Sequence, residues 1–153
     1  MAVNIISWNA SSLTAHSAEL KLYIQNATDK PDIICIQESW LVDSSKFRIN
    51  GYDMESKNRQ VKRGGGVAIF VKNGINYSRV DNIPGDLEGV SVKFETENRS
   101  VTVTNVYLTE ETDIKILRSI MGSQNHIVCG DFNAHNTLWG SKKMTQEEIS
   151  SKI

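Results

Sequence analysis

The stretch that says most about the fold of this chain is residues 127–138, which read IVCGDFNAHNTL. Its first three residues form a short apolar run that is typical of a buried strand, and Gly-Asp-Phe-Asn follows directly. Because alternate strand residues point to the same face, Asp131 and Asn133 are expected to project together, with Phe132 opposed. The stretch therefore predicts a strand that ends in a carboxylate and a carboxamide lying side by side.

This pair of side chains suits the hydrolysis of a phosphate ester. A carboxylate such as Asp131 ligates Mg²⁺ or takes a proton from water, and an amide such as Asn133 donates a hydrogen bond to a phosphate oxygen. An Asp/Asn turn that merely ends a strand has the same residues and is common. The segment alone leaves both interpretations open.

The composition is that of an ordinary globular protein. Of 153 residues, 39% are apolar and 23% charged, which fits a single domain over residues 1–153. The net charge of −1 means that any contact with nucleic acid must come from a local basic patch. No apolar stretch approaches membrane-spanning length and the N-terminus lacks a charged signal region, so we expect an intracellular protein without membrane contact. Cys35 and Cys129 are predicted to be buried thiols rather than a disulfide or a zinc site.

The apolar patterns predict strands interrupted by two helices. A helix capped by Ser12 or Thr14 is expected to run to about residue 27, with Leu20, Tyr23 and Ile24 on one stripe. A second helix is expected over residues 110–121, and a further helix is expected to begin near residue 145. Besides the strand at Ile127, strands are expected at residues 3–8, 32–37, 52–57 (an edge strand), 66–72, 87–95 and 100–108, the last two forming a hairpin.

Polar residues stand at or near the ends of three other predicted strands. Asn9 follows the first strand, Glu38 follows an apolar run at residues 33–37, and Tyr107 lies near the end of the 100–108 strand. Aligned strand ends in a sandwich converge on one rim, so we expect Asn9, Glu38, Tyr107, Asp131 and Asn133 to lie together. One or two carboxylates with retained waters are enough for Mg²⁺.

Four segments in this order resemble the endonuclease/exonuclease/phosphatase superfamily: residues 6–9 (ISWN), 31–38 (PDIICIQE), 105–107 (NVY) and 130–133 (GDFN). Residues 63–71 (RGGGVAIFV) and 134–141 (AHNTLWGS) resemble, more narrowly, the endonuclease domain of non-LTR retrotransposons. The resemblance implies an α/β fold, a four-layer α/β/β/α sandwich. It also implies a DNA endonuclease that nicks its target within a reverse-transcriptase polyprotein, in the nucleus.

Carried over residue by residue, the resemblance gives each rim residue a role. Asn9 and Glu38 would hold the metal, with Asp131 beside them; the metal would be Mg²⁺, with Mn²⁺ as an alternative. Tyr107 would contact the scissile phosphate, Asp131 would orient or deprotonate the attacking water, and Asn133 would steady the transition state. A metal that stabilises phosphoryl charge and a carboxylate that activates water agree with this assignment.

The chain departs from the superfamily at its end. The superfamily closes with a Ser-Asp-His motif, and none of the three histidines here, His16, His126 and His135, follows an aspartate. The chain therefore resembles a fragment or a truncated copy in which the second half is missing. We expect that half to supply much of the second sheet, so that one apolar face is uncovered and nicking by this chain is weak or absent.

A basic cluster precedes the glycine run. Arg59, Lys62 and Arg63 are candidates for binding DNA phosphates, although a short basic loop is as often merely solvated. Two other functions stay open beside that of a DNA endonuclease: an inert relic that binds metal or nucleic acid weakly, and a phosphatase of the same superfamily acting on a small molecule or lipid. The segments RGGG and LWGS favour the nucleic-acid branch over the phosphatase.

Overall fold

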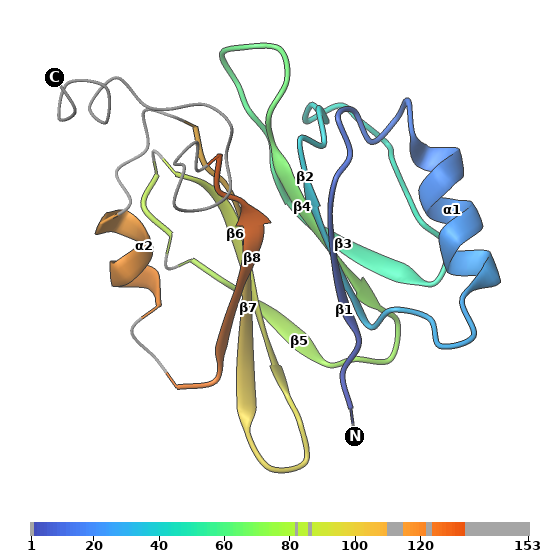
Figure 1. Ribbon diagram of the computed structural model, residues 1–153, viewed down its shortest axis with the longest axis vertical. Helices are drawn as coiled ribbons and strands as arrows, with labels where there is room; N and C mark the ends of the chain where they lie inside the picture. The colour runs from blue at the N-terminus through green and yellow to red at the C-terminus, as the bar shows by residue number, and fades with distance from the viewer. Residues whose placement is uncertain (1, 82, 86, 110–114, 122–123, 134–153) are drawn as a thin grey trace, which may run out of the picture.

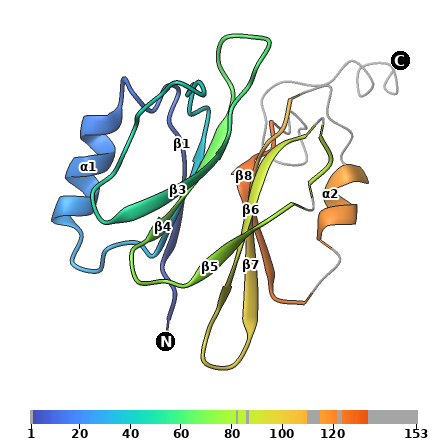
Figure 2. The same ribbon diagram turned by 180° about the vertical axis from the view of Figure 1, so that it is seen from behind.

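Two four-stranded mixed sheets pack face to face between two helices, giving four layers (Figures 1 and 2). The computed structural model describes residues 2–81, 83–85, 87–109, 115–121 and 124–133. Helix α1 (Ser17–Asn26) covers the outer face of the first sheet and α2 (Lys115–Ile120) lies outside the second. The predicted α/β/β/α sandwich is confirmed. Within the described part of the chain, no helix is long and apolar enough to cross a bilayer.

The first sheet has the strand order β1-β2-β4-β3. The strands β1 and β2 are parallel, whereas β4 is antiparallel to both of its neighbours. All five residues of β2 are buried, as expected for a strand covered on both faces. The bounds of the four strands are β1 Ile5–Asn9, β2 Ile33–Gln37, β3 Tyr52–Lys57 and β4 Val67–Lys72.

The second sheet has the order β5-β6-β7-β8. The predicted hairpin forms β6 and β7, and β8 runs parallel to β7. We expected much of this sheet to be absent and one apolar face to be uncovered. The described residues supply four strands of this sheet, and their inner face packs on the first sheet, so the expected uncovered face is not found between the sheets. The bounds are β5 Tyr77–Val80, β6 Glu88–Glu95, β7 Ser100–Tyr107 and β8 His126–Asp131.

The alternation of side chains along the strands divides the core. Ile33, Val67 and Ile69 of the first sheet meet Val92 and Val103 of the second in the inter-sheet cluster. The intervening residues of the first sheet face the other way, toward α1. Both cysteines are free and belong to the inter-sheet cluster. The hydrogen bond between the two thiols raises the pKa of Cys35 and lowers the pKa of Cys129 to about 7.

Helix α1 begins later than the sequence predicts. The residue before it, His16, makes no capping hydrogen bond through its side chain, whereas Ser12 or Thr14 was the expected cap. The N–H groups of Ser12 and Leu13 instead donate to the carbonyls of Glu38 and Ser39 at 2.9 and 3.0 Å. These contacts with the strand-end segment hold residues 11–16 in turns, so the helix starts only at residue 17.

Three other expectations also differ. Tyr23, placed on the buried stripe of α1, is 52% exposed, while Leu20 and Ile24 are buried as expected. Ile127 is 41% exposed because β8 is an edge strand rather than a fully buried one. Strand β5 was not predicted. The helix expected near residue 145 and residues 110–114 of the second predicted helix lie outside the described residues.

Candidate active site

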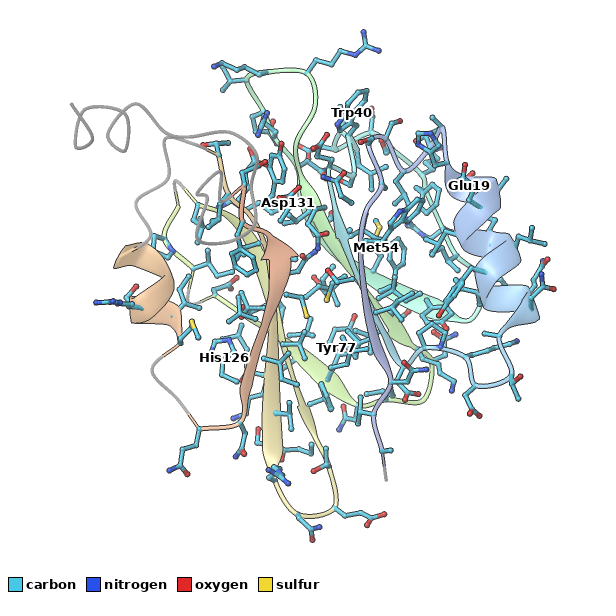
Figure 3. All side chains as sticks on the ribbon, viewed as in Figure 1. Glu19, Trp40, Met54, Tyr77, His126 and Asp131 are labelled. Carbon is cyan, nitrogen blue, oxygen red and sulfur yellow. The ribbon has the colours of Figure 1, made fainter. Side chains whose placement is uncertain are left out.

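The carboxyl ends of four strands meet at one rim of the sandwich. Strands β1 and β2 are parallel within one sheet, as β7 and β8 are within the other. Each parallel pair therefore ends at a single edge, and the two edges lie on the same side of the molecule, where Asp131 stands in Figure 3. The rim carries, at or just after these ends, Asn9, Glu38, Tyr107, Asp131 and Asn133.

Asn9 joins the two carboxylates of the rim. Its Nδ2 donates to Glu38 Oε1 at 3.0 Å and to Asp131 Oδ2 at 2.8 Å. Since Glu38 follows the first sheet and Asp131 ends the second, this one amide spans the interface between the sheets. The amide offers positive hydrogens to both anions and so offsets their mutual repulsion.

Tyr107 and Asn133 complete the group. The Tyr107 hydroxyl lies close enough to Glu38 and to the Asn133 side chain for both to act on its pKa. Burial raises the pKa of Tyr107, and the charge of Glu38 raises it further, so the phenol stays protonated and able to donate. Asn133 donates its backbone N–H to Asp131 Oδ1 at 3.0 Å and its side-chain amide to the Leu108 carbonyl at 2.6 Å. The convergence of the five residues expected from the sequence is therefore observed.

The backbone after β2 adopts an uncommon conformation at the site. Glu38 has φ +50° and Trp40 has φ +54°, in the left-handed region that residues other than glycine rarely occupy. Hydrogen bonds hold the segment in place, because the N–H groups of Ser39 and Trp40 donate to the carbonyls of Gly66 and Gly65 at 3.1 and 2.9 Å. Backbone strain of this kind persists where the surroundings enforce it, and it gathers at functional sites.

The residues at the rim fit a hard divalent cation. Glu38 and Asp131 offer carboxylate oxygens, which Mg²⁺ prefers, and the ion keeps several waters elsewhere. Asn9 Oδ1 accepts from the Ser11 N–H at 3.1 Å, so its amide nitrogen faces the carboxylates; ligation by Asn9 requires the amide to turn over. Among the residues that the structure describes, no group of three or more His, Cys, Asp or Glu gathers, so the candidate set is two carboxylates and one amide.

The basic residues lie on the loop between β3 and β4, residues 58–66, which we call the basic loop. It projects at the end of the sandwich that carries the rim (Figure 1). Lys62 and Arg63 are exposed, and the Arg63 guanidinium lies over the ring of Trp40, 5.8 Å from its centroid. Arg59 differs, since it is half-buried, pairs with Glu88 and lies over the ring of Tyr107.

A buried amide pair beneath the rim was not foreseen as part of the site. Gln37 Nε2 donates to Asn105 Oδ1 at 2.6 Å and to Ser7 Oγ at 3.1 Å. Asn105 Nδ2 donates in turn to the carbonyls of Ile36 and Ala68 at 2.7 and 2.9 Å. The pair fixes one sheet against the other, directly below Glu38 and Tyr107. Its signal in the sequence is a polar residue within each of two apolar strands.

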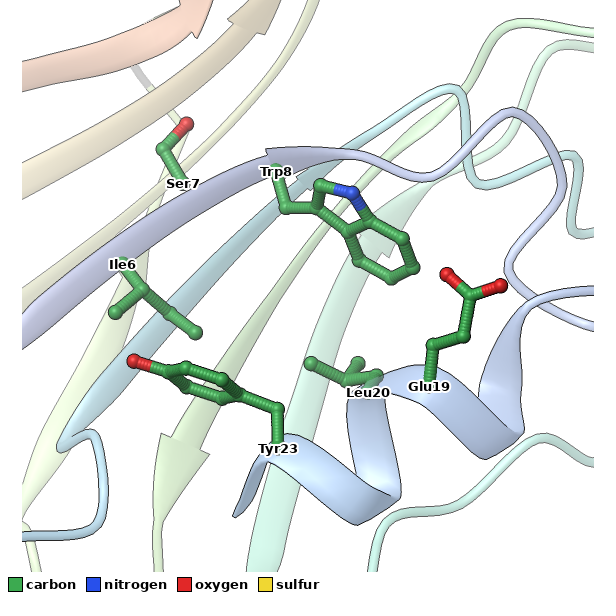
Figure 4. Close-up of a pocket in the computed structure, with 6 residues that line it drawn as sticks. All are labelled: Ile6, Ser7, Trp8, Glu19, Leu20 and Tyr23. Atoms are coloured by element: carbon green, nitrogen blue, oxygen red, sulfur yellow. The ribbon is translucent and has the colours of Figure 1, made fainter. Parts of the chain in front are cut away.

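A separate pocket lies away from the rim, between β1 and α1 (Figure 4). Its volume is 370 Å³ and its walls include Ile6, Trp8, Leu20 and Tyr23. Trp8 contributes to the core on the α1 side of the first sheet, whereas its neighbour Asn9 reaches the rim. Strand alternation thus separates this apolar pocket from the polar site.

Comparison with known proteins relates this chain to one protein family. The profile of the Endonuclease/Exonuclease/phosphatase family matches residues 6–149. The RNA-directed DNA polymerase from mobile element jockey of Drosophila melanogaster is 28% identical in an alignment 156 positions long, which covers 94% of this chain and 17% of that protein. The chain thus spans less than a fifth of this relative.

Two solved structures share the fold. The endonuclease domain of TRAS1, a telomere-specific non-LTR retrotransposon, superposes with a TM-score of 0.71 at 24% identity, over 97% of this chain and 68% of that one. The 3′ phosphatase NExo from Neisseria, bound to a product DNA hairpin, gives a TM-score of 0.57 at 21% identity, over 86% and 58% of the two chains.

Proposed function

The chain belongs to the endonuclease/exonuclease/phosphatase family, and on this premise we propose that its rim is the active site of a DNA endonuclease that depends on Mg²⁺, with Mn²⁺ as a substitute. The observation that carries the proposal is the Asn9 amide held between Glu38 and Asp131. Asn9, Glu38 and Asp131 come from three strand ends in both sheets and meet at this point. The two carboxylates are suitable ligands for a hard cation.

Each residue of the rim has a task in the hydrolysis of a phosphodiester. Glu38, Asp131 and, with its amide turned over, Asn9 would hold the metal, which would neutralise charge on the phosphoryl oxygens. Tyr107, kept protonated, donates its hydroxyl hydrogen to the scissile phosphate. Asp131 orients the attacking water and takes its proton, and the Asn133 amide donates to the oxygen on which charge grows in the transition state.

The basic loop supports DNA as the substrate. Lys62 and Arg63 are exposed at the end of the molecule that carries the rim, where cationic side chains position a duplex through its phosphates; Arg59 lies at the base of the loop. We place the protein in the nucleus, as part of a reverse-transcriptase polyprotein. The likeness to the jockey polymerase supports the polyprotein, and the DNA bound to the Neisseria phosphatase supports DNA as the substrate.

A plasmid assay tests the activity. The 153 residues, incubated with supercoiled plasmid and Mg²⁺, are expected to nick weakly, because no Ser-Asp-His run is present and each missing acid–base group removes about 10²–10⁴-fold in rate. The weak activity should vanish in EDTA and in Asp131→Ala. Efficient nicking that is lost in Asp131→Ala would refute the expected weakness. Activity unchanged in Asp131→Ala would refute the site.

A melting experiment tests the metal site without relying on catalysis. Binding to the folded state alone raises the melting temperature, so excess Mg²⁺ should stabilise the natural chain but not Glu38→Gln. Glu95→Gln, at an exposed position on the second sheet, is the matched control and should respond like the natural chain. An equal response of all three proteins would contradict the metal site and would favour an inert relic.

A further inference from the structure

A chain of contacts connects the base of the basic loop to the tyrosine of the rim. Glu88 begins β6 and is paired in register with Tyr107 at the end of β7, so the two side chains leave the same face of the sheet. The Arg59 guanidinium lies over the Tyr107 ring, with Cζ 5.7 Å from the centroid, and its Nε donates to the Glu88 carboxylate. Arg59 thus contacts two directly opposed residues of the second sheet.

The same contacts reach the backbone beside Glu38. The second oxygen of Glu88 accepts from the Gly66 N–H at 2.9 Å. Gly65 has φ +66°, and a Cβ there would collide with the Arg59 guanidinium, so the glycine allows the arginine to lie directly on the loop. The carbonyls of Gly65 and Gly66 hold the segment that follows Glu38. Arg59 and Glu88 therefore contact both Tyr107 and the glycines whose carbonyls hold the segment after Glu38.

The Arg59–Glu88 ion pair is more buried than the Arg79–Asp81 pair. The side chains of Arg59 and Glu88 are 22% and 19% exposed, whereas those of Arg79 and Asp81 are 40% and 90% exposed. Exposed ion pairs contribute little to stability. A half-buried guanidinium that donates to a carboxylate is held in one orientation, because its planar shape limits how it can form hydrogen bonds. A cation over a ring also favours one placement of that ring.

Resting on the proposed function, we propose that Arg59 and Glu88 are positioning residues, which hold the Tyr107 ring so that its hydroxyl stays against Glu38 and Asn133. The role of Arg59 then differs from that of Lys62 and Arg63. The exposed residues of the basic loop meet DNA, while Arg59 connects the loop to a residue that contacts the scissile phosphate.

Fluorine NMR of protein labelled with 3-fluorotyrosine tests the positioning directly. The chain has four tyrosines, and loss of one resonance in Tyr107→Phe assigns the signal of interest. In metal-free protein, Arg59→Met and Glu88→Gln should each shift and broaden the Tyr107 resonance. Arg59→Lys keeps the charge but loses the planar fork, so its Tyr107 resonance should lie between those of the natural chain and Arg59→Met.

A matched control is available on the other edge of the sheet. Arg79 pairs with Glu55 at 3.2 Å, and Glu55 also accepts from the Tyr77 hydroxyl at 3.3 Å. Arg79→Met should therefore move the Tyr77 resonance and leave that of Tyr107 unchanged. If the Tyr107 resonance is the same in the natural chain, Arg59→Met and Glu88→Gln, the proposal is overturned. Glu88→Gln hardly alters side-chain size, so the comparison stays decisive even if Arg59→Met fails to fold.

A second arm separates this inference from the proposed function. Mg²⁺ with a short duplex DNA should move the Tyr107 resonance of the natural chain, and the response should be smaller in Arg59→Met. No response in the natural chain would count against the endonuclease site, while the metal-free comparison would still decide whether Arg59 and Glu88 hold Tyr107. An equal response in the natural chain and Arg59→Met would overturn the positioning role.

Discussion

Replacement of Asn105 by leucine should destabilise the protein, because this side chain connects the two sheets below the rim. The amide is fully buried and makes three hydrogen bonds, with the carbonyls of Ile36 and Ala68 and with the side chain of Gln37. Leucine has a similar volume but neither donates nor accepts. Water does not reach the position, so the groups that lose Asn105 gain no substitute partner.

The magnitude follows from these contacts. Three buried hydrogen bonds at about 1 kcal/mol each amount to about 3 kcal/mol, and the added apolar surface of leucine offsets at most about 1 kcal/mol of this. The free energy of unfolding should therefore fall by about 2–3 kcal/mol. For a chain of this length, such a loss lowers the melting temperature by roughly 4–12 °C.

Thermal and urea denaturation followed by circular dichroism measure the effect. Asn98→Leu, at an exposed position in the β6–β7 turn, is the matched control and should melt within about 2 °C of the natural chain. Because Gln37 precedes Glu38, the Asn105→Leu variant should also lose part of its stabilisation by Mg²⁺. A melting temperature equal to that of the natural chain would refute the argument that the amide pair holds the sheets together.

Two further predictions concern the stability of variants at Gly65 and Tyr77. Gly65→Ala forces a side chain into the left-handed region and against Arg59, so it should cost about 1–2 kcal/mol, whereas Gly85→Ala, with open space around its Cβ, should be nearly neutral in the same urea titration. Burial, with the charge of Glu55, raises the pKa of Tyr77 to about 12 in the folded protein, whereas the unfolded chain releases this proton near pH 10. The contribution of protonated Tyr77 to the free energy of unfolding is therefore complete below pH 10 and is lost as the pH rises toward 12. Tyr77→Phe should therefore show a shallower alkaline decline in stability, and identical pH profiles would contradict the stated cause.

The strands that carry the site could be predicted because their signals are local. Apolar runs at residues 33–37 and 67–71 mark strands buried on both faces, and a polar residue at the end of a run points to a rim. Asn9, Glu38 and Asp131 lie where that reasoning expects them. Helix α1 shows the opposite case, since hydrogen bonds from the distant Glu38 segment decide where it begins, and no pattern within the helix encodes them.

The supports of the site are harder to predict for the same reason. Strand β5 is four residues long and only partly buried, so it lacks the alternation that reveals a strand. Arg59 and Glu88 form an ion pair, but in the sequence they look like two ordinary surface charges, and no local pattern indicates their contact. The orientation of the Asn9 amide depends on Ser11 and two carboxylates together, which three-dimensional geometry alone brings into contact.

The hydrogen bond between Asn9 and Asp131 joins residues that are 122 positions apart. Closing so long a loop has a large entropic cost, which only the contacts of the assembled sandwich offset. We therefore expect the paired carboxylates to come together late in folding, after both sheets have formed and docked. During synthesis, a ribosome-bound chain that has emerged only as far as β7 presents Asn9 and Glu38 without their acidic partner. The proposed nuclease site is thus incomplete in a nascent chain until nearly all of the described fold has been made.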